Sequence, residues 1–273
     1  MKNETTLHAL PNSHYAQDLD VRWRRKHALA GNALAMYEIA EDHLYWHKLG
    51  ADGRQALSWF TKAADAGSDD ACLVLAAVYR LGYLELHVLA KCESVERFSI
   101  QKDRAKASFY KRRAKILAEK KRKPDGRALY DAGAGWCRFS PDNRTSIHVS
   151  CAFTGDFPTR VLTAFRDRLD RDVPVNLYMD SEGVYDILAE GDTSGSESFW
   201  IHEDLNKRGG PKVRKLCCDM VALAKQIVTD IESDYYGWAT FNYGHGFRQK
   251  ESRLRRLVAA LKKAIRGFDQ RKN

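Results

Sequence analysis

The chain has 273 residues, of which 44% are hydrophobic and 30% are charged, with 18 glycines and 6 prolines. This composition excludes a disordered, collagen-like or low-complexity protein, and the length fits two domains or one long repeat array. The net charge of +9 favours polyanionic or acidic partners, and the sequence contains no run of about 18 apolar residues that could span a membrane.

The amino-terminal 20 residues lack the apolar segment of a secretory signal. We therefore expect a cytoplasmic protein with reduced cysteines. The six cysteines form no C-x-x-C pair, which argues against a zinc ribbon. His43 and His47 lie one helical turn apart, but Leu44 stands where a zinc protease motif needs Glu, so we expect them to pack instead. No metal and no cofactor are predicted.

The first elements repeat at an offset of 36 residues. The matched positions hold the same residue type in both copies: Trp23 and Trp59, Lys26 and Lys62, Ala28 and Ala64, Ala30 and Ala66, Gly31 and Gly67. Small and apolar residues then recur at helical spacing in each copy, and the glycines mark the turn between two helices. One helix pair cannot cover its own apolar face, so the pattern predicts stacked antiparallel pairs.

These residues resemble the Sel-one-like repeat, a relative of the tetratricopeptide repeat, with the pattern A-x-x-W-Y-x-K-A-A-x-x-G followed by A-x-x-x-L-G-x-x-Y. Residues 56–67 and 71–82 follow it, and a further half-unit follows at 103–114. Ala40 and Ala76 replace a glycine of the family pattern, and the resemblance covers about residues 15–120. It implies an α-solenoid that binds proteins on a curved helical surface.

A candidate partner-facing row lies on the helix that carries the apolar stripe of Ala35, Ile39 and His43. Tyr37, Glu41 and Tyr45 fall opposite its apolar stripe and are the candidate protein-binding residues. Plain solvent exposure, or packing against the second domain, is the alternative interpretation.

A basic segment ends the helical region. Residues 101–127 hold twelve Lys or Arg and three Asp or Glu. Pro124 cannot continue a helix, and glycine, proline and asparagine are frequent in the residues that follow. We predict a helical repeat domain over residues 1–124, a linker over 125–143 and an α+β domain with a small mixed or antiparallel sheet over 144–273.

The residues after this linker predict strands and helices in turn. We expect strands at 145–153, 173–179, 184–189, 196–202 and 235–243, and helices at 156–171, 211–233 and 249–267. This order suggests a small sheet backed by helices. The carboxylates near 180–186 and at 203–204, with His202, make an enzyme site in this domain the third alternative for function.

The last predicted helix is amphipathic within a second basic segment, residues 245–273, which holds ten Lys or Arg and two Asp or Glu. Its apolar residues share a narrow arc, and the charged side chains lie largely outside it. The candidate polyanion-binding or acidic-partner residues are Arg255, Arg256, Lys262, Lys263 and Arg266. A merely solvated basic face is the alternative.

Taken together, these patterns predict a cytoplasmic, bacterial adaptor or scaffold, regulatory roles included, that binds another protein through a short helical-repeat surface. The alternative is nucleic-acid binding through basic segments 101–127 and 245–273. No membrane partner is expected.

Overall fold

The computed structural model describes residues 14–44, 52–87, 95–122, 126–133, 136–141, 147–150, 156–180, 186–191, 198–203, 212–217, 219–241 and 246–272. The chain divides into two compact units, Met1–Lys123 and Pro124–Asn273. A helical region is followed by a region of antiparallel strands and helices, which agrees with the predicted fold class at that level.

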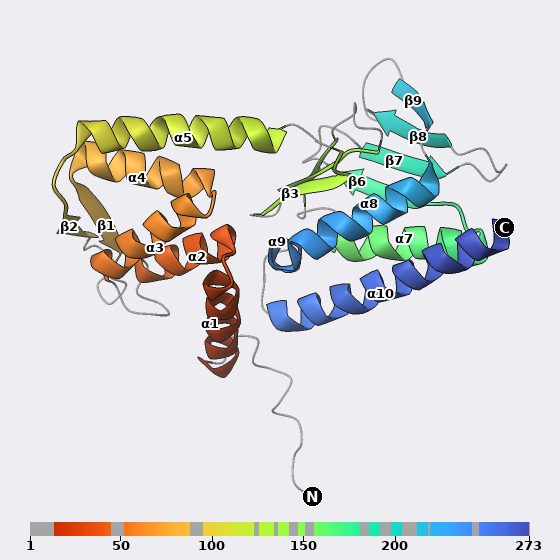
Figure 1. Cartoon of the computed structure of the whole chain (residues 1–273), viewed down its shortest axis with the longest axis horizontal. Coiled ribbons are helices and arrows are strands. Elements are labelled where there is room, and N and C mark those ends of the chain that lie inside the picture. Colours follow the sequence, from red (N-terminus) through yellow and green to blue (C-terminus); the bar gives the residue numbers. More distant parts are fainter. Residues whose placement is uncertain are drawn as a thin grey trace, which may run out of the picture. The chain divides into compact units, whose positions relative to one another are not determined.

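The first unit is built from helices that pack in chain order, with one β-hairpin (Figure 1). Its elements are α1 (His14–Leu29), α2 (Ala33–Leu44), α3 (Gly53–Asp65), α4 (Asp69–Leu81), β1 (Tyr83–His87), β2 (Val95–Ser99) and α5 (Arg104–Arg122). Strands β1 and β2 pair antiparallel, and β1 lies against α2, α3 and α4. Each of α2, α3 and α4 packs between the helix before it and the helix after it.

The turns after α1 and α3 have the same geometry, 36 residues apart. Gly31 and Gly67 have φ values of 96° and 103°, a conformation that glycine adopts without a Cβ clash. The backbone N–H of Asn32 donates to the carbonyl of His27 at 3.1 Å, and the N–H of Ser68 donates to the matching carbonyl of Ala63 at 2.9 Å. The two helix hairpins are thus closed by the same turn.

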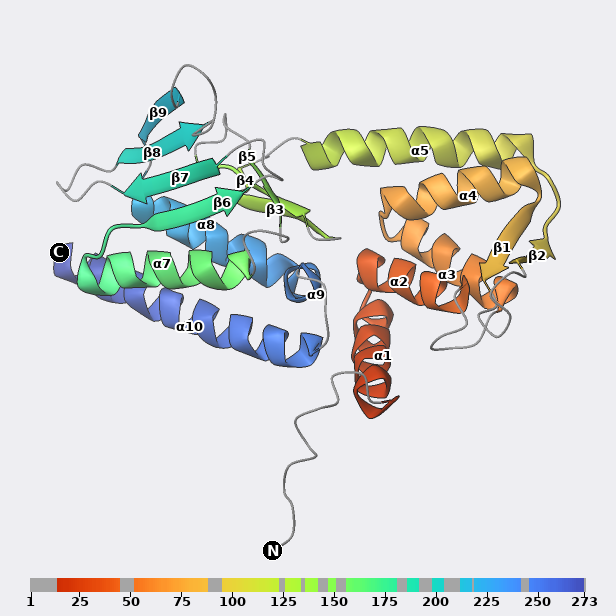
Figure 2. The same ribbon diagram turned by 180° about the vertical axis from the view of Figure 1, so that it is seen from behind.

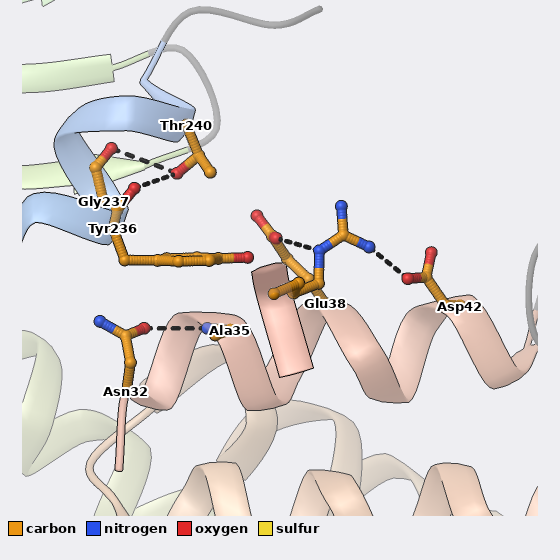
Figure 3. Close-up of polar contacts among 8 residues, drawn as sticks. Asn32, Ala35, Glu38, Asp42, Tyr236, Gly237 and Thr240 are labelled. Carbon is orange, nitrogen blue, oxygen red and sulfur yellow. Dashed lines mark hydrogen bonds and ion pairs between the residues drawn. The ribbon is translucent and has the colours of Figure 1, made fainter. Parts of the chain in front are cut away.

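The second helix of each hairpin also begins in the same way. The side-chain oxygen of Asn32 accepts a hydrogen bond from the backbone N–H of Ala35 at 2.9 Å, as drawn in Figure 3. Ser68 does the same for the N–H of Ala71 at 3.1 Å. These oxygens satisfy N–H groups that have no partner inside the helix.

The core of the first unit contains the matched residues of the two copies. Trp23 and Trp59 are each 7% exposed, so both copies of the repeat bury this residue. Around them, alanines are buried completely at Ala28, Ala35, Ala64 and Ala71. Small residues allow helices to approach closely, while the tryptophans fill the larger gaps.

The second unit combines two antiparallel sheets with helices. Its elements are β3 (Leu129–Gly133), β4 (Trp136–Phe139), β5 (Ile147–Ser150), α7 (Phe157–Arg171), β6 (Asn176–Asp180), β7 (Asp186–Gly191), β8 (Ser198–Glu203), β9 (Lys212–Cys217), α8 (Met220–Ser233), α9 (Tyr235–Thr240) and α10 (Phe247–Lys272). The strand orders are β3-β4-β5 and β6-β7-β8-β9. Figures 1 and 2 show α7, α8 and α10 gathered on one side of the strands.

The predicted linker over 125–143 is wrong for much of its length, because β3 and β4 lie within it and pair antiparallel. Ala128 and Leu129 are buried, and their backbone N–H groups donate to the carboxylate of Asp230 in α8 at 2.7 and 2.9 Å. Gly133 therefore lies in a strand that pairs with β4, and a distant side chain anchors the start of that strand.

Two other elements differ from the sequence-based expectation. Residues 235–240 form helix α9 rather than a strand, since the carboxylate of Asp234 caps it by accepting from the N–H of Gly237 at 3.0 Å. Residues 212–217 form strand β9 rather than the start of a helix, and α8 begins only after Asp219, which caps it. In both cases an aspartate cap sets the helix start.

Candidate protein-binding surface

Helix α5 closes the first unit and is firmly attached to α4. The carboxylate of Asp103 caps it by accepting from the N–H of Lys106 at 2.9 Å. The rings of Tyr110 and Tyr79 stack with centroids 6.0 Å apart and planes inclined by 3°. Burial raises the pKa of the Tyr110 hydroxyl, so this side chain stays neutral over the physiological range.

Two basic side chains of α5 reach the turn between α3 and α4. The guanidinium of Arg113 donates to the backbone carbonyl of Asp65 at 3.2 Å, and the ammonium of Lys121 pairs with the carboxylate of Asp69. The helix is therefore fixed at both of these positions, and its orientation on α4 does not depend on a ligand.

The face of α5 that points away from this contact carries large apolar side chains. Phe109 is 48% exposed and Ile116 is 55% exposed. The two are seven residues apart and share one side of the helix with Arg112 and Lys120, which are also exposed. Among the described elements, α4 is the one that packs extensively against α5, so this outer face has no comparable neighbour there.

The outer face is also strongly basic. Helix α5 contains nine Lys or Arg and one Glu. Four of these cations are exposed and form no ion pair with any residue in the described part of the chain: Arg104, Lys111, Arg112 and Lys120. The surface thus combines uncovered apolar area with uncompensated positive charge.

The predicted row on α2 packs within the first unit. The ring of Tyr37 lies edge-on to Phe60 of α3, with centroids 5.5 Å apart. Glu41 is partly buried; burial raises its pKa, and a hydrogen bond from the Tyr37 hydroxyl partly offsets this shift. Tyr45 lies outside the described residues. Tyr37 therefore packs against the next helix hairpin, Glu41 accepts a hydrogen bond from Tyr37 within α2, and both side chains remain half-buried.

A buried arginine connects α1 with α2. The guanidinium of Arg24 lies 3.0 Å from the carboxylate of Glu38 and also pairs with Asp42, one turn further along α2. Figure 3 labels Glu38 and Asp42 and marks the contact of each carboxylate with the guanidinium as a dashed line. Sequence reasoning did not find this cluster. The available signal is the spacing of Glu38 and Asp42, which are four residues apart and so share one side of α2. A basic residue in the preceding helix can then pair with both.

The five basic candidates of α10 fall into two groups. Arg255 pairs with Glu251 and lies over the ring of Tyr235, 4.0 Å from its centroid. Lys262 pairs with Glu232 of α8 at 2.6 Å. These two side chains therefore have partners within the second unit.

The other three candidates lie on the outer side of the helix. Arg256, Lys263 and Arg266 are exposed and form no ion pair with another described residue. Their spacing of seven and three residues puts them along one side, opposite the buried Leu254, Val258 and Leu261. The structure thus brings together three of the five predicted residues as an open basic row.

The residues named for an enzyme lie in or beside strands β6, β7 and β8, at positions whose side chains the structure does not describe. No group of three or more His, Cys, Asp or Glu side chains suited to a metal occurs in the described part of the chain. Backbone pairing places Asp180 opposite Asp186 across β6 and β7, while residues 182 and 204 lie outside the described residues.

The sequence-based prediction also did not identify the outer face of α5, because it indicated only a basic segment there. The signal was available, since Phe109 and Ile116 are two helical turns apart among lysines and arginines. What the sequence does not show is that α4 covers the opposite side of the helix.

Comparison with protein-family models, with curated proteins and with solved structures found no match for this chain. No helix within the described ranges is long and apolar enough to cross a lipid bilayer.

Proposed function

We propose that this chain binds another protein through its first unit and acts as an adaptor or scaffold. The observation that carries this proposal is the outer face of α5, where Phe109 and Ile116 are about half exposed on a helix that is otherwise well anchored. Exposed large apolar side chains grouped on one rigid element are typical of protein interaction sites.

The same proposal includes the repeat architecture. We regard the α1–α2 and α3–α4 hairpins as two units of a Sel-one-like repeat, and α5 as the first helix of a third unit in a short solenoid. Support comes from the local structure of the two hairpins. Their turn hydrogen bonds and helix caps occur at matched positions 36 residues apart. An array that ends after the first helix of a unit leaves one helix face open.

Affinity capture with the full-length chain, from a lysate of the cell that makes it, tests the proposal. Nuclease-treated and untreated lysates are compared, and each captured protein is then purified and measured against the purified chain. We expect at least one protein that survives nuclease treatment and binds directly. If every captured protein is lost on nuclease treatment, the adaptor function is refuted.

A second candidate function is nucleic-acid binding through α10. The observation that favours it is the open row of Arg256, Lys263 and Arg266, whose charges no described acidic side chain neutralises. Phosphate contacts release counterions, so this mode predicts a steep loss of affinity with added salt. Protein binding through the apolar α5 face predicts a shallower dependence.

We further propose a cytoplasmic location. The buried thiol of Cys72, which is in no disulfide, supports a reducing compartment. Burial also raises the pKa of this thiol, which keeps it protonated and unreactive.

A further inference from the structure

We propose that the outer face of α5 docks an acidic amphipathic helix of a partner protein, which covers Phe109 and Ile116 and pairs with Arg112 and Lys120. This inference rests on the proposed protein-binding function and specifies the partner's chemistry and the place where it binds.

The spacing of the apolar residues matches the two-turn interval of a second helix. Phe109 and Ile116 are seven residues apart, which is about 10 Å along the helix axis. Arg112 lies between them and Lys120 one turn beyond, so all four share one side of α5. A second helix that packs along this line presents its own apolar residues at the same two-turn interval.

The charge around this line selects an acidic partner. Arg112 and Lys120 lie along the apolar line itself, whereas Arg104, Lys111 and Lys115 form a second basic row about 100–160° further around the helix. Of these, Lys115 lies 4.0 Å from Glu119, the single acid of the helix, while Arg104 and Lys111 form no ion pair with other described residues. Carboxylates that flank the apolar stripe of a partner helix would pair with Arg112 and Lys120, while the second basic row adds a longer-range attraction that steers the approach.

Two other occupants fit the face less well. A second copy of the chain that docks through the same face would bring two strongly basic helices together, which costs energy through like-charge repulsion. A nucleic acid would satisfy the cations, but its phosphates would leave Phe109 and Ile116 uncovered. An acidic amphipathic helix satisfies both the apolar and the charged residues.

The face is in place before any partner binds. The Tyr79–Tyr110 stack, the Arg113 hydrogen bond to Asp65 and the Lys121–Asp69 pair hold the opposite side of α5. A preformed face loses little conformational freedom on binding, which favours measurable affinity even for a single helix.

The test uses the full-length chain and a fluorescent synthetic helical peptide that carries Leu at its two apolar heptad positions and Glu beside them. Fluorescence anisotropy measures its dissociation constant at physiological salt. A control peptide keeps every Leu and replaces each Glu with Lys. We expect the acidic peptide to bind and the basic peptide to bind at least ~10-fold more weakly.

Two double variants locate the contact. Phe109→Ser with Ile116→Ser should weaken acidic-peptide binding by at least ~10-fold. Arg112→Glu with Lys120→Glu breaks no ion pair to another described residue and should shift the preference towards the basic peptide. Leu29→Ser is the matched control, since Leu29 is 75% exposed on α1, and it should bind like the parent. Circular dichroism verifies the fold of each variant, and the charge-reversed variant keeps the test decisive if the serine variant unfolds.

Several outcomes would overturn the inference. One is an acidic peptide that does not bind the parent, and another is binding that survives both double variants. A third is a dimer of the full-length chain that the serine substitutions dissociate, since the occupant would then be a second copy. If an authentic protein partner binds the parent and the serine variant equally, the adaptor function stands and only this assignment of the α5 face fails.

Discussion

The carboxylate of Asp230 in α8 accepts a 2.9 Å hydrogen bond from the backbone N–H of Leu129, a residue 101 positions earlier in β3. The same oxygen accepts from Ala128 at 2.7 Å, and Gln226 donates to the other carboxylate oxygen at 2.9 Å. One buried aspartate thus joins the first strand of the second unit to its central helix.

We expect Asp230→Ala to lower the free energy of unfolding by about 2–5 kcal/mol, because it leaves two buried backbone N–H groups without an acceptor. Urea denaturation followed by circular dichroism measures this change. The control is Asp269→Ala, which removes an exposed pair with Lys225 and should cost less than about 0.5 kcal/mol. Equal effects of the two substitutions would contradict a special role for Asp230.

The repeated turns show which parts of the fold are readable from sequence. Gly31 and Gly67 set their turns through local backbone conformation, and Trp23 and Trp59 are buried by the helices on either side of those turns. These turns and helix contacts form between residues that are close along the chain. A sequence repeat of 36 residues is therefore long enough to reveal them. The matching of the two copies made the first unit predictable.

The second unit was harder to predict because distant residues decide its elements. β3 and β4 form where glycines indicated a linker, since Asp230 provides acceptors from far along the chain. The aromatic segment 235–240 alternates like a strand, yet all of Tyr236–Thr240 is buried and the segment is helical. In α10, sequence showed which residues are basic, but only the fold shows that Arg255 and Lys262 are already paired.

Trp23→Ala and Trp59→Ala should each lower the free energy of unfolding by about 3–5 kcal/mol, since both rings lie in the core between helices. Similar losses are expected because the two positions are equivalent in the repeat. Leu29→Ala is the control, because Leu29 is largely exposed, and should change stability by less than about 0.5 kcal/mol. A large loss at one tryptophan only would contradict the equivalence of the hairpins.

Glu41 should make the stability of the first unit depend on pH. Burial raises the pKa of its carboxyl group, while the Tyr37 hydrogen bond lowers it by less. A carboxyl whose pKa is higher in the folded than in the unfolded state stabilises the fold most below its unfolded pKa, and this stabilisation is lost as the pH rises through the folded pKa.

Glu41→Gln cannot ionise, so its stability relative to the parent should increase between about pH 4 and about pH 7. Thermal unfolding of both proteins across this range gives the comparison. Glu119→Gln is the control, because Glu119 is exposed on α5. A constant difference between Glu41→Gln and the parent at every pH would show that burial does not perturb this carboxyl group.

The open basic row of α10 should contribute to polyanion binding and hardly to folding. Replacement of Arg256, Lys263 and Arg266 with Gln breaks no ion pair to another described residue, so the variant should melt close to the parent. If nucleic acid binds along this row, each lost phosphate contact lowers the slope of log K against log salt by about 0.9. Anisotropy of a labelled DNA duplex over a range of salt concentrations measures that slope.

A second triple variant removes the same charge from the same helix but at paired positions: Arg253→Gln, Arg255→Gln and Lys262→Gln. These side chains contact Asp156, Glu251 and Glu232, so this variant should melt at a lower temperature than the first. It should also keep most of the DNA affinity if the open row makes the phosphate contacts. Equal losses of affinity in both variants would mean that net charge alone attracts DNA. Unchanged affinity in the first would mean that Arg256, Lys263 and Arg266 are only solvated, and the second candidate function would then lose its support from α10.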